Sequence, residues 1–358
     1  MTRVAVVGTG LIGGSILLRL AETARSDAAF PGSARSDAEL DVCGWDPDPG
    51  TRREGRGRGL VFADELVEAV READVVFLCG PLPTLPETLA TVTKSTGDGC
   101  VITDVGSTKS ALATYAVEHG LADRFVPGHP MSGTERAGLT AAAPELLRGA
   151  AWVLCPPSDA PLDHFRTLAA LLVRVFEAKI VPMSPVVHDS AAALASHIPH
   201  LLAGSLAGAV ARSPLRDAVL GLAAGSFRDG TRVAGAPSRR TADMVINNRD
   251  AVLRQLGAVQ EFLAALADAV RDDDVEALQR RYAEGRGLRE ALLDRRVAAS
   301  VRRFPRAGSS AGNGGGAGTG TGGAERDFLL ALGESGGYLT GCAVEPTEVV
   351  YAACAPER

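Results

Sequence analysis

Three short segments carry the side chains best suited to chemistry, and each contains serine or histidine. Ser107 and His129 follow the ends of two predicted β-strands, which is where open α/β sheets bind their ligands. A histidine in such a place is a candidate general base, because neutral imidazole accepts a proton. The alternatives are that His129 lies in a simple turn, that Ser107 or Thr108 caps the next helix, and that His197 and His200 are core residues of one helical face. The segments read Asp104-Val-Gly-Ser107-Thr-Lys109, Gly128-His129-Pro130-Met-Ser-Gly133-Thr-Glu135 and Ala195-Ser-His197-Ile-Pro-His200.

The chain opens with a glycine signature of the kind that binds dinucleotides. An apolar run at residues 3–7 predicts a strand, and the G-x-G-x-x-G run after it begins a helical pattern. Gly8 permits the tight turn, Gly10 lets a pyrophosphate approach the backbone, and Gly13 lets the helix pack closely on the strand. The N–H groups at the helix N-terminus then bind the phosphates. Contacts to the cofactor are expected from Gly8, Gly10, Leu11, Ile12 and Gly13.

An acidic residue at the end of the next strand completes this signature. Asp46 follows the predicted strand at 40–45 and lies farther from Gly13 than is usual, which we attribute to a polar loop insertion at 25–39. Its carboxylate is expected to bind the ribose hydroxyls and to repel a 2′-phosphate. The sequence therefore predicts NAD rather than NADP, with Arg52 and Arg53 near enough in sequence to leave the alternative open.

Composition excludes several classes of protein. The net charge of −6 argues against nucleic acid or an anionic membrane as a partner. The six cysteines are scattered, with no zinc-ligand spacing, and resemble the reduced thiols of a cytoplasmic protein. The N-terminus has no basic region or cleavage site typical of a signal peptide. The longest apolar stretch, 191–211, contains His197, Pro199 and His200, and is predicted to be a buried helix rather than a membrane span. The sequence thus predicts a cytoplasmic protein without a metal site.

Alternation of short β-rich runs with helical patterns predicts an α/β fold for residues 1–183, a Rossmann-type parallel sheet domain. Strands are expected at 3–7, 40–45, 75–79, 100–104, 125–128, 151–155 and 178–182. Helices are expected at 13–24, 62–71, 84–94, 109–118 and 163–176.

Residues 184–305 are predicted to form an all-helical domain, because the strand signal ends and apolar residues recur at helical spacing. Helices are expected at 187–212, 216–224, 241–271 and 273–303, with Asp272–Asp274 supplying a cap between the last two. The wide apolar face formed by Val252, Leu256, Val259, Leu263 and Leu266 indicates either an internal core or, as we favour, the core of a homodimer.

The last part of the chain has two distinct compositions. Residues 306–324 are almost entirely Gly, Ala, Ser and Thr, which predicts a flexible linker. Residues 325–358 form a short tail in which 328–332 favour a helix, Gly336-Gly337 a turn and 349–353 a strand. So short a tail cannot form a stable domain alone.

Taken in order, these motifs resemble the prephenate/arogenate dehydrogenase family. The resemblance rests on the run from Gly8 to Ser15, the three segments above, and Gly230-Thr-Arg232-Val-Ala, and it covers residues 1 to about 303. It implies a Rossmann domain followed by a helical dimerisation domain, an NAD-dependent enzyme, and a homodimer that binds one small-molecule substrate. The implied reaction is the oxidative decarboxylation of prephenate to 4-hydroxyphenylpyruvate in tyrosine biosynthesis.

The resemblance also implies a role for individual side chains. His129 matches the catalytic histidine that hydrogen-bonds the ring hydroxyl of the substrate, and Ser107 matches the serine that assists there. Glu135 matches a glutamate at the mouth of the site, and His197 a second histidine of the substrate pocket. Arg232 matches the arginine that binds a substrate carboxylate, for which a guanidinium is well suited.

The match weakens after Arg232. Family members commonly have Asp-Pro and then tryptophan there, whereas this chain has Gly235-Ala-Pro-Ser-Arg239-Arg240-Thr241, with Thr241 at the tryptophan position. The extra arginines either hold an anion or lie in solvent. The substrate therefore stays open between prephenate, arogenate and an amino-substituted prephenate. The less favoured interpretations are another two-domain dehydrogenase, which would need a lysine that 187–212 lacks, and an NAD-binding module without activity.

Overall fold

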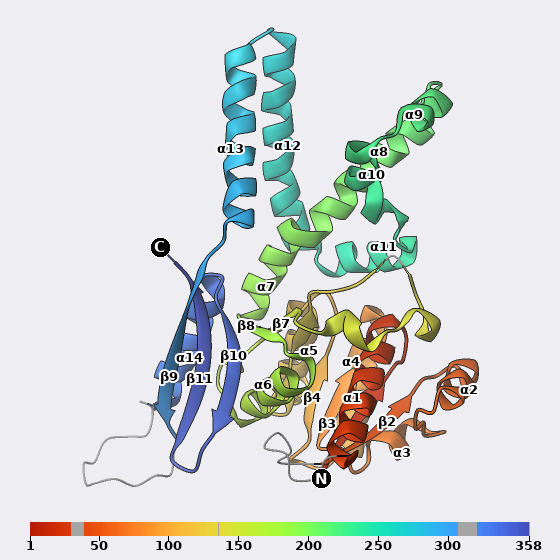
Figure 1. Cartoon of the computed structure of the whole chain (residues 1–358), viewed down its shortest axis with the longest axis vertical. Helices are drawn as coiled ribbons and strands as arrows, with labels where there is room; N and C mark the ends of the chain where they lie inside the picture. Colours follow the sequence, from red (N-terminus) through yellow and green to blue (C-terminus); the bar gives the residue numbers. More distant parts are fainter. Residues whose placement is uncertain (30–38, 135, 307–320, 358) are drawn as a thin grey trace.

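The first half of the chain forms a five-stranded parallel sheet, as predicted. The computed structural model describes residues 1–29, 39–134, 136–306 and 321–357 (Figure 1). Strand order is β2-β1-β3-β4-β5, so the order reverses beside β1, where open α/β folds bind nucleotides. The strands are β1 (Thr2–Val7), β2 (Leu40–Trp45), β3 (Val75–Leu78), β4 (Val101–Asp104) and β5 (Phe125–Val126). The helices are α1 (Leu11–Ala29), α2 (Pro49–Gly57), α3 (Leu66–Val70), α4 (Leu85–Ser95) and α5 (Ser110–Glu118).

A second, mixed sheet of six strands lies beside the first, which corrects the expectation of a single parallel sheet. Its order is β6-β7-β8-β10-β11-β9, with β6 antiparallel to β7. The short strand β6 carries His129 and brings it next to β7 rather than continuing β5. The first three strands are β6 (Gly128–Pro130), β7 (Ala151–Leu154) and β8 (Lys179–Pro182), and α6 (Asp163–Phe176) connects β7 to β8.

The C-terminal residues complete this second sheet. The prediction of a helix at 273–303 is wrong beyond residue 293, because β9 (Val297–Pro305) pairs along its whole length with β11 (Glu348–Pro356). Its apolar spacing suits a helix locally, but cross-strand pairing decides the conformation. β10 (Tyr338–Val344) joins the sheet to β8 through Leu339 and Ile180. The expected linker falls mostly at residues 307–320, outside the described residues, and its last four residues belong to α14 (Thr321–Glu334).

A buried polar cluster fastens α14 and β11 to α6. Arg166 donates to both carboxylate oxygens of Glu325, at 2.9 and 2.5 Å, and the Tyr351 hydroxyl donates to Glu325 at 2.8 Å. Glu325 is 1% exposed and Tyr351 is fully buried. The tail is therefore an integral part of the second sheet, which explains how so short a segment is stable.

The regular elements of residues 185–293 are all helices, as predicted for this part. Figure 1 shows the α12–α13 hairpin and α8 projecting away from both sheets. Asp274 caps α13 by accepting from the Ala277 N–H at 2.8 Å, which confirms the expected cap. The predicted helix at 241–271 is broken at Asn248. The helices are α7 (Pro185–Ala192), α8 (Ile198–Ala211), α9 (Arg216–Leu222), α10 (Gly225–Thr231), α11 (Ser238–Asn247), α12 (Arg249–Arg271) and α13 (Val275–Leu293), with a π-helical turn at Ala193–His197.

Many large apolar side chains of this helical part are exposed. Leu263 of the face predicted to form a dimer core is 49% exposed, whereas Val252 at its other end is buried. The helical stretch Pro185–Ala211 is long and apolar enough to cross a membrane by length and composition alone, and 22% of its most apolar window is buried. These exposed faces lack an intramolecular partner within the described residues, so an internal core accounts for only part of the pattern.

Candidate active site

The glycine loop between β1 and α1 has the geometry that its sequence predicts. Gly8 has φ of 89°, a left-handed conformation that favours glycine. A Cβ atom added at Gly13 would lie 1.9 Å from the Gly8 carbonyl oxygen, so this glycine is needed for the helix to pack. A Cβ atom added at Gly10 would meet no atom within 4 Å. Open space over Gly10 beside a helix N-terminus fits the pyrophosphate of a dinucleotide.

Asp46 lies beside this loop at the end of β2. Its carboxylate accepts from the Thr9 N–H at 2.7 Å, the Thr9 hydroxyl at 3.2 Å and the Asp48 N–H at 3.0 Å, which leaves a lone pair on Oδ1 for a further donor. Arg52 donates to the Asp46 backbone carbonyl at 2.6 Å, so its guanidinium is already engaged by the backbone. Arg53 is exposed. This arrangement suits a ribose diol better than a 2′-phosphate.

A fully buried ion pair joins the two loops that carry Ser107 and His129. The Lys109 ammonium is paired with the Asp104 carboxylate and donates to the Gly128 carbonyl at 2.7 Å. The other oxygen of Asp104 accepts from the Gly128 N–H at 3.1 Å. The end of β4 and the start of β6 are thereby held against each other, immediately beside both predicted residues.

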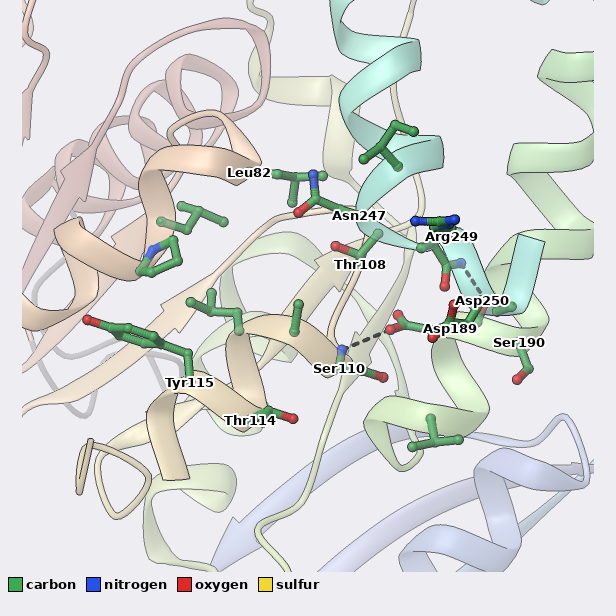
Figure 2. Close-up of a pocket in the computed structure, with 18 of the residues that line it drawn as sticks. Leu82, Thr108, Ser110, Thr114, Tyr115, Asp189, Ser190, Asn247, Arg249 and Asp250 are labelled. Carbon is green, nitrogen blue, oxygen red and sulfur yellow. Dashed lines mark hydrogen bonds between the residues drawn. The ribbon is translucent and has the colours of Figure 1, made fainter. Parts of the chain in front are cut away.

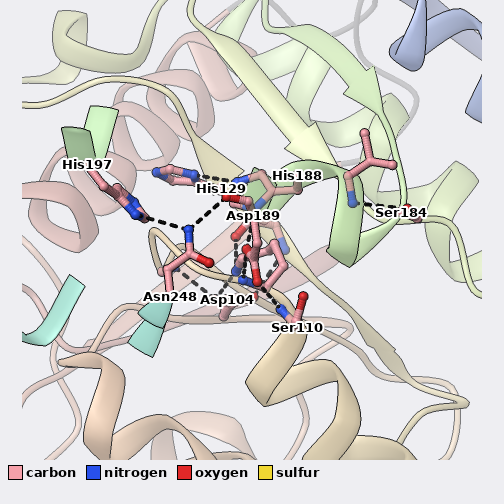
Figure 3. Close-up of polar contacts among 12 residues, drawn as sticks. Asp104, Ser110, His129, Ser184, His188, Asp189, His197 and Asn248 are labelled. Atoms are coloured by element: carbon pink, nitrogen blue, oxygen red, sulfur yellow. Dashed lines mark hydrogen bonds and ion pairs between the residues drawn. The ribbon is translucent and has the colours of Figure 1, made fainter. Parts of the chain in front are cut away.

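His129 is the first of three polar side chains in a row (Figure 3). Its Nδ1 lies 2.9 Å from Nε2 of His188, and Nδ1 of His188 lies 2.8 Å from a carboxylate oxygen of Asp189. Burial, with the nearby His188, Lys109 and His197, lowers the pKa of His129 well below its usual value. His129 is therefore neutral at physiological pH, as a general base must be.

Asp189 also connects the helical part to the nucleotide-binding part. Its carboxylate accepts from the backbone N–H groups of Lys109 and Ser110 at 2.7 and 2.8 Å, and so caps α5. Burial is the largest single influence on the pKa of Asp189 and raises it, but the hydrogen bonds from His188, Ser110 and Lys109 together lower this pKa below its usual value. The alternative that Ser107 caps this helix is wrong, because Asp189 of α7 does so.

His197 lies in the π-helical turn, fully buried. Pro199 has no N–H to continue the α-helical pattern, and the turn widens so that the Ile198 N–H bonds Ala193. Asn248 donates to Nδ1 of His197 at 3.1 Å and to the Asp189 carbonyl at 2.8 Å. Burial lowers the pKa of His197 to about 4. Its buried Nε2 has no partner at ordinary hydrogen-bond geometry in the described part of the chain.

The structure brings Ser107, His129 and His197 to one region. The Ser107 backbone lies close enough to His197 to raise its pKa slightly against the effect of burial. Glu135 lies outside the described residues. Arg232 follows α10 in a short 3-10 turn (residues 232–235), where its side chain is exposed. Its predicted role therefore rests on the sequence match alone.

The altered segment near Arg232 has two features. Arg239 pairs with Asp243 on its own helix, whereas Arg240 donates to the Thr134 carbonyl at 3.1 Å. Thr241 lines a mainly apolar cavity of about 400 Å³, together with His200. Both arginines therefore contact protein groups here, and the cavity is lined by Thr241, for which the family resemblance led us to expect tryptophan.

A larger cavity, of about 750 Å³, borders the same polar network (Figure 2). It is lined by α4, α5, α7 and the start of α12, and includes Ser110, Asp189 and Asn248 but neither His129 nor the glycine loop. Within the described residues no group of three or more His, Cys, Asp and Glu is placed to hold a metal ion. All six cysteines are free.

Sequence reasoning missed His188, Asp189 and Asn248. The signal for the first two was a His-Asp pair at the start of an otherwise apolar helix. Asn248 offered none, because its importance depends on the break between α11 and α12. Lys109 was noted only as part of its motif.

Comparison with known proteins places this site in a family. The family model described as "Prephenate dehydrogenase, nucleotide-binding domain" matches residues 34–182, and that described as "Prephenate dehydrogenase, dimerization domain" matches residues 184–284. The chain is 30% identical to the prephenate dehydrogenase of Lactococcus lactis over 82% of this chain and 78% of that protein. The chain belongs to the prephenate dehydrogenase family. The predicted family, the two-part fold class, the NAD-dependent oxidoreductase class and the NAD cofactor are thereby confirmed.

Two further relatives carry different substrate names. The cyclohexadienyl dehydrogenase of Zymomonas mobilis is 30% identical over 81% of this chain and 95% of that protein. The solved structure of Synechocystis arogenate dehydrogenase has 27% identity and a TM-score of 0.67, covering 81% of this chain and all of that one. The family includes several cyclohexadienol substrates, and similarity at this level does not choose among them.

Proposed function

We propose that this chain catalyses the NAD-dependent oxidative decarboxylation of prephenate to 4-hydroxyphenylpyruvate and CO2. The proposal rests mainly on the position of His129, a neutral imidazole that the buried Asp104–Lys109 pair holds beside the carboxyl ends of the strands. Its Nδ1 is occupied by His188, which leaves Nε2 for the substrate hydroxyl. The two relatives named prephenate dehydrogenase, from Lactococcus lactis and Bacillus subtilis, support this choice of substrate.

In the proposed reaction His129 accepts the proton of the ring hydroxyl at Nε2. Bound NAD supplies the hydride acceptor for the carbon that bears this hydroxyl. The C–CO2 bond then breaks, its electron pair makes the ring aromatic, and His129 returns its proton to the phenolate oxygen. Proton and electrons balance, because one hydride leaves with the cofactor and the hydroxyl proton is only borrowed.

We propose four further contacts to the substrate. Ser107 and the buried Nε2–H of His197 are suited to donate hydrogen bonds to its oxygens. Arg232 is proposed to bind a carboxylate, and Glu135 to lie at the mouth of the site. Gly8, Gly10, Leu11, Ile12 and Gly13 are proposed to hold the pyrophosphate, and Asp46 the ribose.

A homodimer is the proposed assembly, in the cytoplasm. Exposed leucines along α8 and α12, such as Leu206 and Leu263, support it, as does the match to a dimerization-domain model. The six free cysteines fit a reducing compartment. Light scattering on dilute protein should give twice the chain mass, and a monomer at micromolar concentration would contradict the assembly.

The test of the activity is a substrate comparison. Purified protein is incubated with NAD and with prephenate, arogenate or 4-amino-4-deoxyprephenate, while the 340 nm absorbance of NADH and the release of CO2 are followed. We expect the highest kcat/KM with prephenate. Arogenate is the second candidate, because the Synechocystis relative is an arogenate dehydrogenase. A higher kcat/KM with arogenate than with prephenate would make arogenate the substrate. No NADH with any of the three would refute the reaction.

A further inference from the structure

His129 belongs to a row of hydrogen-bonded side chains, and elementary chemistry determines which atom donates and which accepts in each bond. The row runs from β6 into α7: His129 Nδ1 to His188 Nε2 at 2.9 Å, and His188 Nδ1 to Asp189 at 2.8 Å (Figure 3). The two imidazole planes meet at 76°. His188 is 2% exposed and Asp189 5%, so solvent does not compete for these bonds.

The ionised carboxylate at the end of the row can only accept. Nδ1 of His188 must therefore donate to Asp189, and in a neutral ring this leaves a lone pair on Nε2. That lone pair accepts a proton held on Nδ1 of His129, so the lone pair of His129 is left on Nε2. Asp189 itself is fixed by the N–H groups of Lys109 and Ser110. The carboxylate thus determines, through His188, which nitrogen of His129 is basic.

We propose that His188 and Asp189 are positioning residues that hold His129 in the tautomer with a basic Nε2 and offset the charge it gains in the reaction. This inference rests on the proposed function of His129 as the base. After proton transfer, imidazolium at His129 donates to His188, whose other nitrogen donates to the anionic Asp189. The negative charge at the end of the row thus stabilises the cation through two hydrogen bonds.

Other charged groups around the row make this compensation necessary. His188, Lys109 and His197 all face His129, and positive charge on any of them disfavours a second cation there. Asp104 is already paired with Lys109. Asp189 is the carboxylate that the hydrogen-bonded row connects to His129, through His188.

The first test requires no turnover. The full-length protein is labelled with ¹⁵N-histidine, and the His129 resonances are assigned by comparison with His129→Asn. We expect Nδ1 to show the shift of a protonated nitrogen and Nε2 that of an unprotonated one. A proton on Nε2 instead would overturn the proposal, whether or not the enzyme uses prephenate. Absence of turnover with the expected tautomer would refute only the proposed function.

The second test compares two substitutions of His188. In His188→Gln the amide oxygen can still accept from His129, whereas His188→Leu keeps bulk and loses the acceptor. We expect His188→Leu to lower kcat about 10- to 100-fold with KM within about threefold, the size expected for one charge-assisted hydrogen bond. His188→Gln should retain a higher kcat than His188→Leu. His164→Gln, in a half-buried histidine of α6 whose ring bonds the Asp123 carbonyl, is the matched control.

The pH profile separates this role from simple packing. Loss of a neutral His188 that stabilises the cation should move the acid limb of kcat/KM to lower pH. Loss of a cationic His188 would move it to higher pH, because the repulsion would be relieved. An upward shift, an unchanged limb, or a wild-type kcat in His188→Leu would each overturn the proposal.

Discussion

Replacing Lys109 with Met removes the cation from the fully buried pair that joins β4 to β6. Lys109 and Asp104 are both 0% exposed, and Met fills a similar volume, so the main effect is an unpaired carboxylate in the interior. Its remaining donors are the N–H groups of Gly106 and Gly128, at 2.9 and 3.1 Å. Breaking a buried pair in this way costs about 3–5 kcal/mol of the free energy of unfolding.

The assay is urea denaturation followed by the fluorescence of Trp152, which is fully buried. For a domain of this size that loss corresponds to a fall of about 10 °C in Tm. The double variant Asp104→Asn with Lys109→Met removes both charges, and should be more stable than Lys109→Met alone. Two results would refute the argument that the unpaired carboxylate is responsible. One is an unfolding free energy of Lys109→Met within about 1 kcal/mol of wild type, and the other is a double variant less stable than Lys109→Met.

Three further outcomes are expected. Gly10→Ala should fold with a normal Tm yet bind NAD at least tenfold more weakly by calorimetry, because its added Cβ atom meets no protein atom. Gly13→Ala should have a lower Tm, because its added Cβ atom meets the backbone of Gly8, and equal Tm values for the two variants would contradict this. The pKa of His129 lies well below its usual value, and the neutral form is active. The kcat/KM should therefore be level at neutral pH and fall only below the ordinary histidine range, and an acid limb at pH 7 would contradict this. Glu325→Ala removes the buried carboxylate that pairs with Arg166 and leaves Arg166 only its partly exposed partner Asp163. It should lower the unfolding free energy by about 1–3 kcal/mol in denaturant, and no change would show that the tail is not anchored there.

Local chemistry made much of the fold predictable. The glycine loop, the strands β1 to β4 and the cap at Asp274 depend on neighbouring residues, and each lies where the sequence indicated. The second sheet depends on long-range pairing. Val297 to Pro305 has apolar spacing that fits a helix, and only β11, more than forty residues later, makes it a strand.

The candidate site likewise has residues that the sequence made predictable and residues that it did not. Ser107 and His129 follow strand ends and were predictable as chemistry, and the structure places both beside the Asp104–Lys109 pair. The importance of Asp189 was not predictable, because its carboxylate caps a helix 79 residues away in sequence. No pattern within either segment encodes that contact.

The central claim is that His129 is the base of a dehydrogenase, and His129→Asn tests it most directly. Asn keeps a polar side chain but cannot titrate, so kcat with NAD and prephenate should fall about 10²–10⁴-fold, the usual contribution of a positioned acid–base group. Arg232→Ala, in contrast, should raise KM far more than it lowers kcat. The account predicts that His129→Asn binds NAD normally and loses the acid limb of its pH profile. A His129→Asn enzyme that keeps most of its kcat and the same acid limb would contradict it, and would show that another group takes the proton.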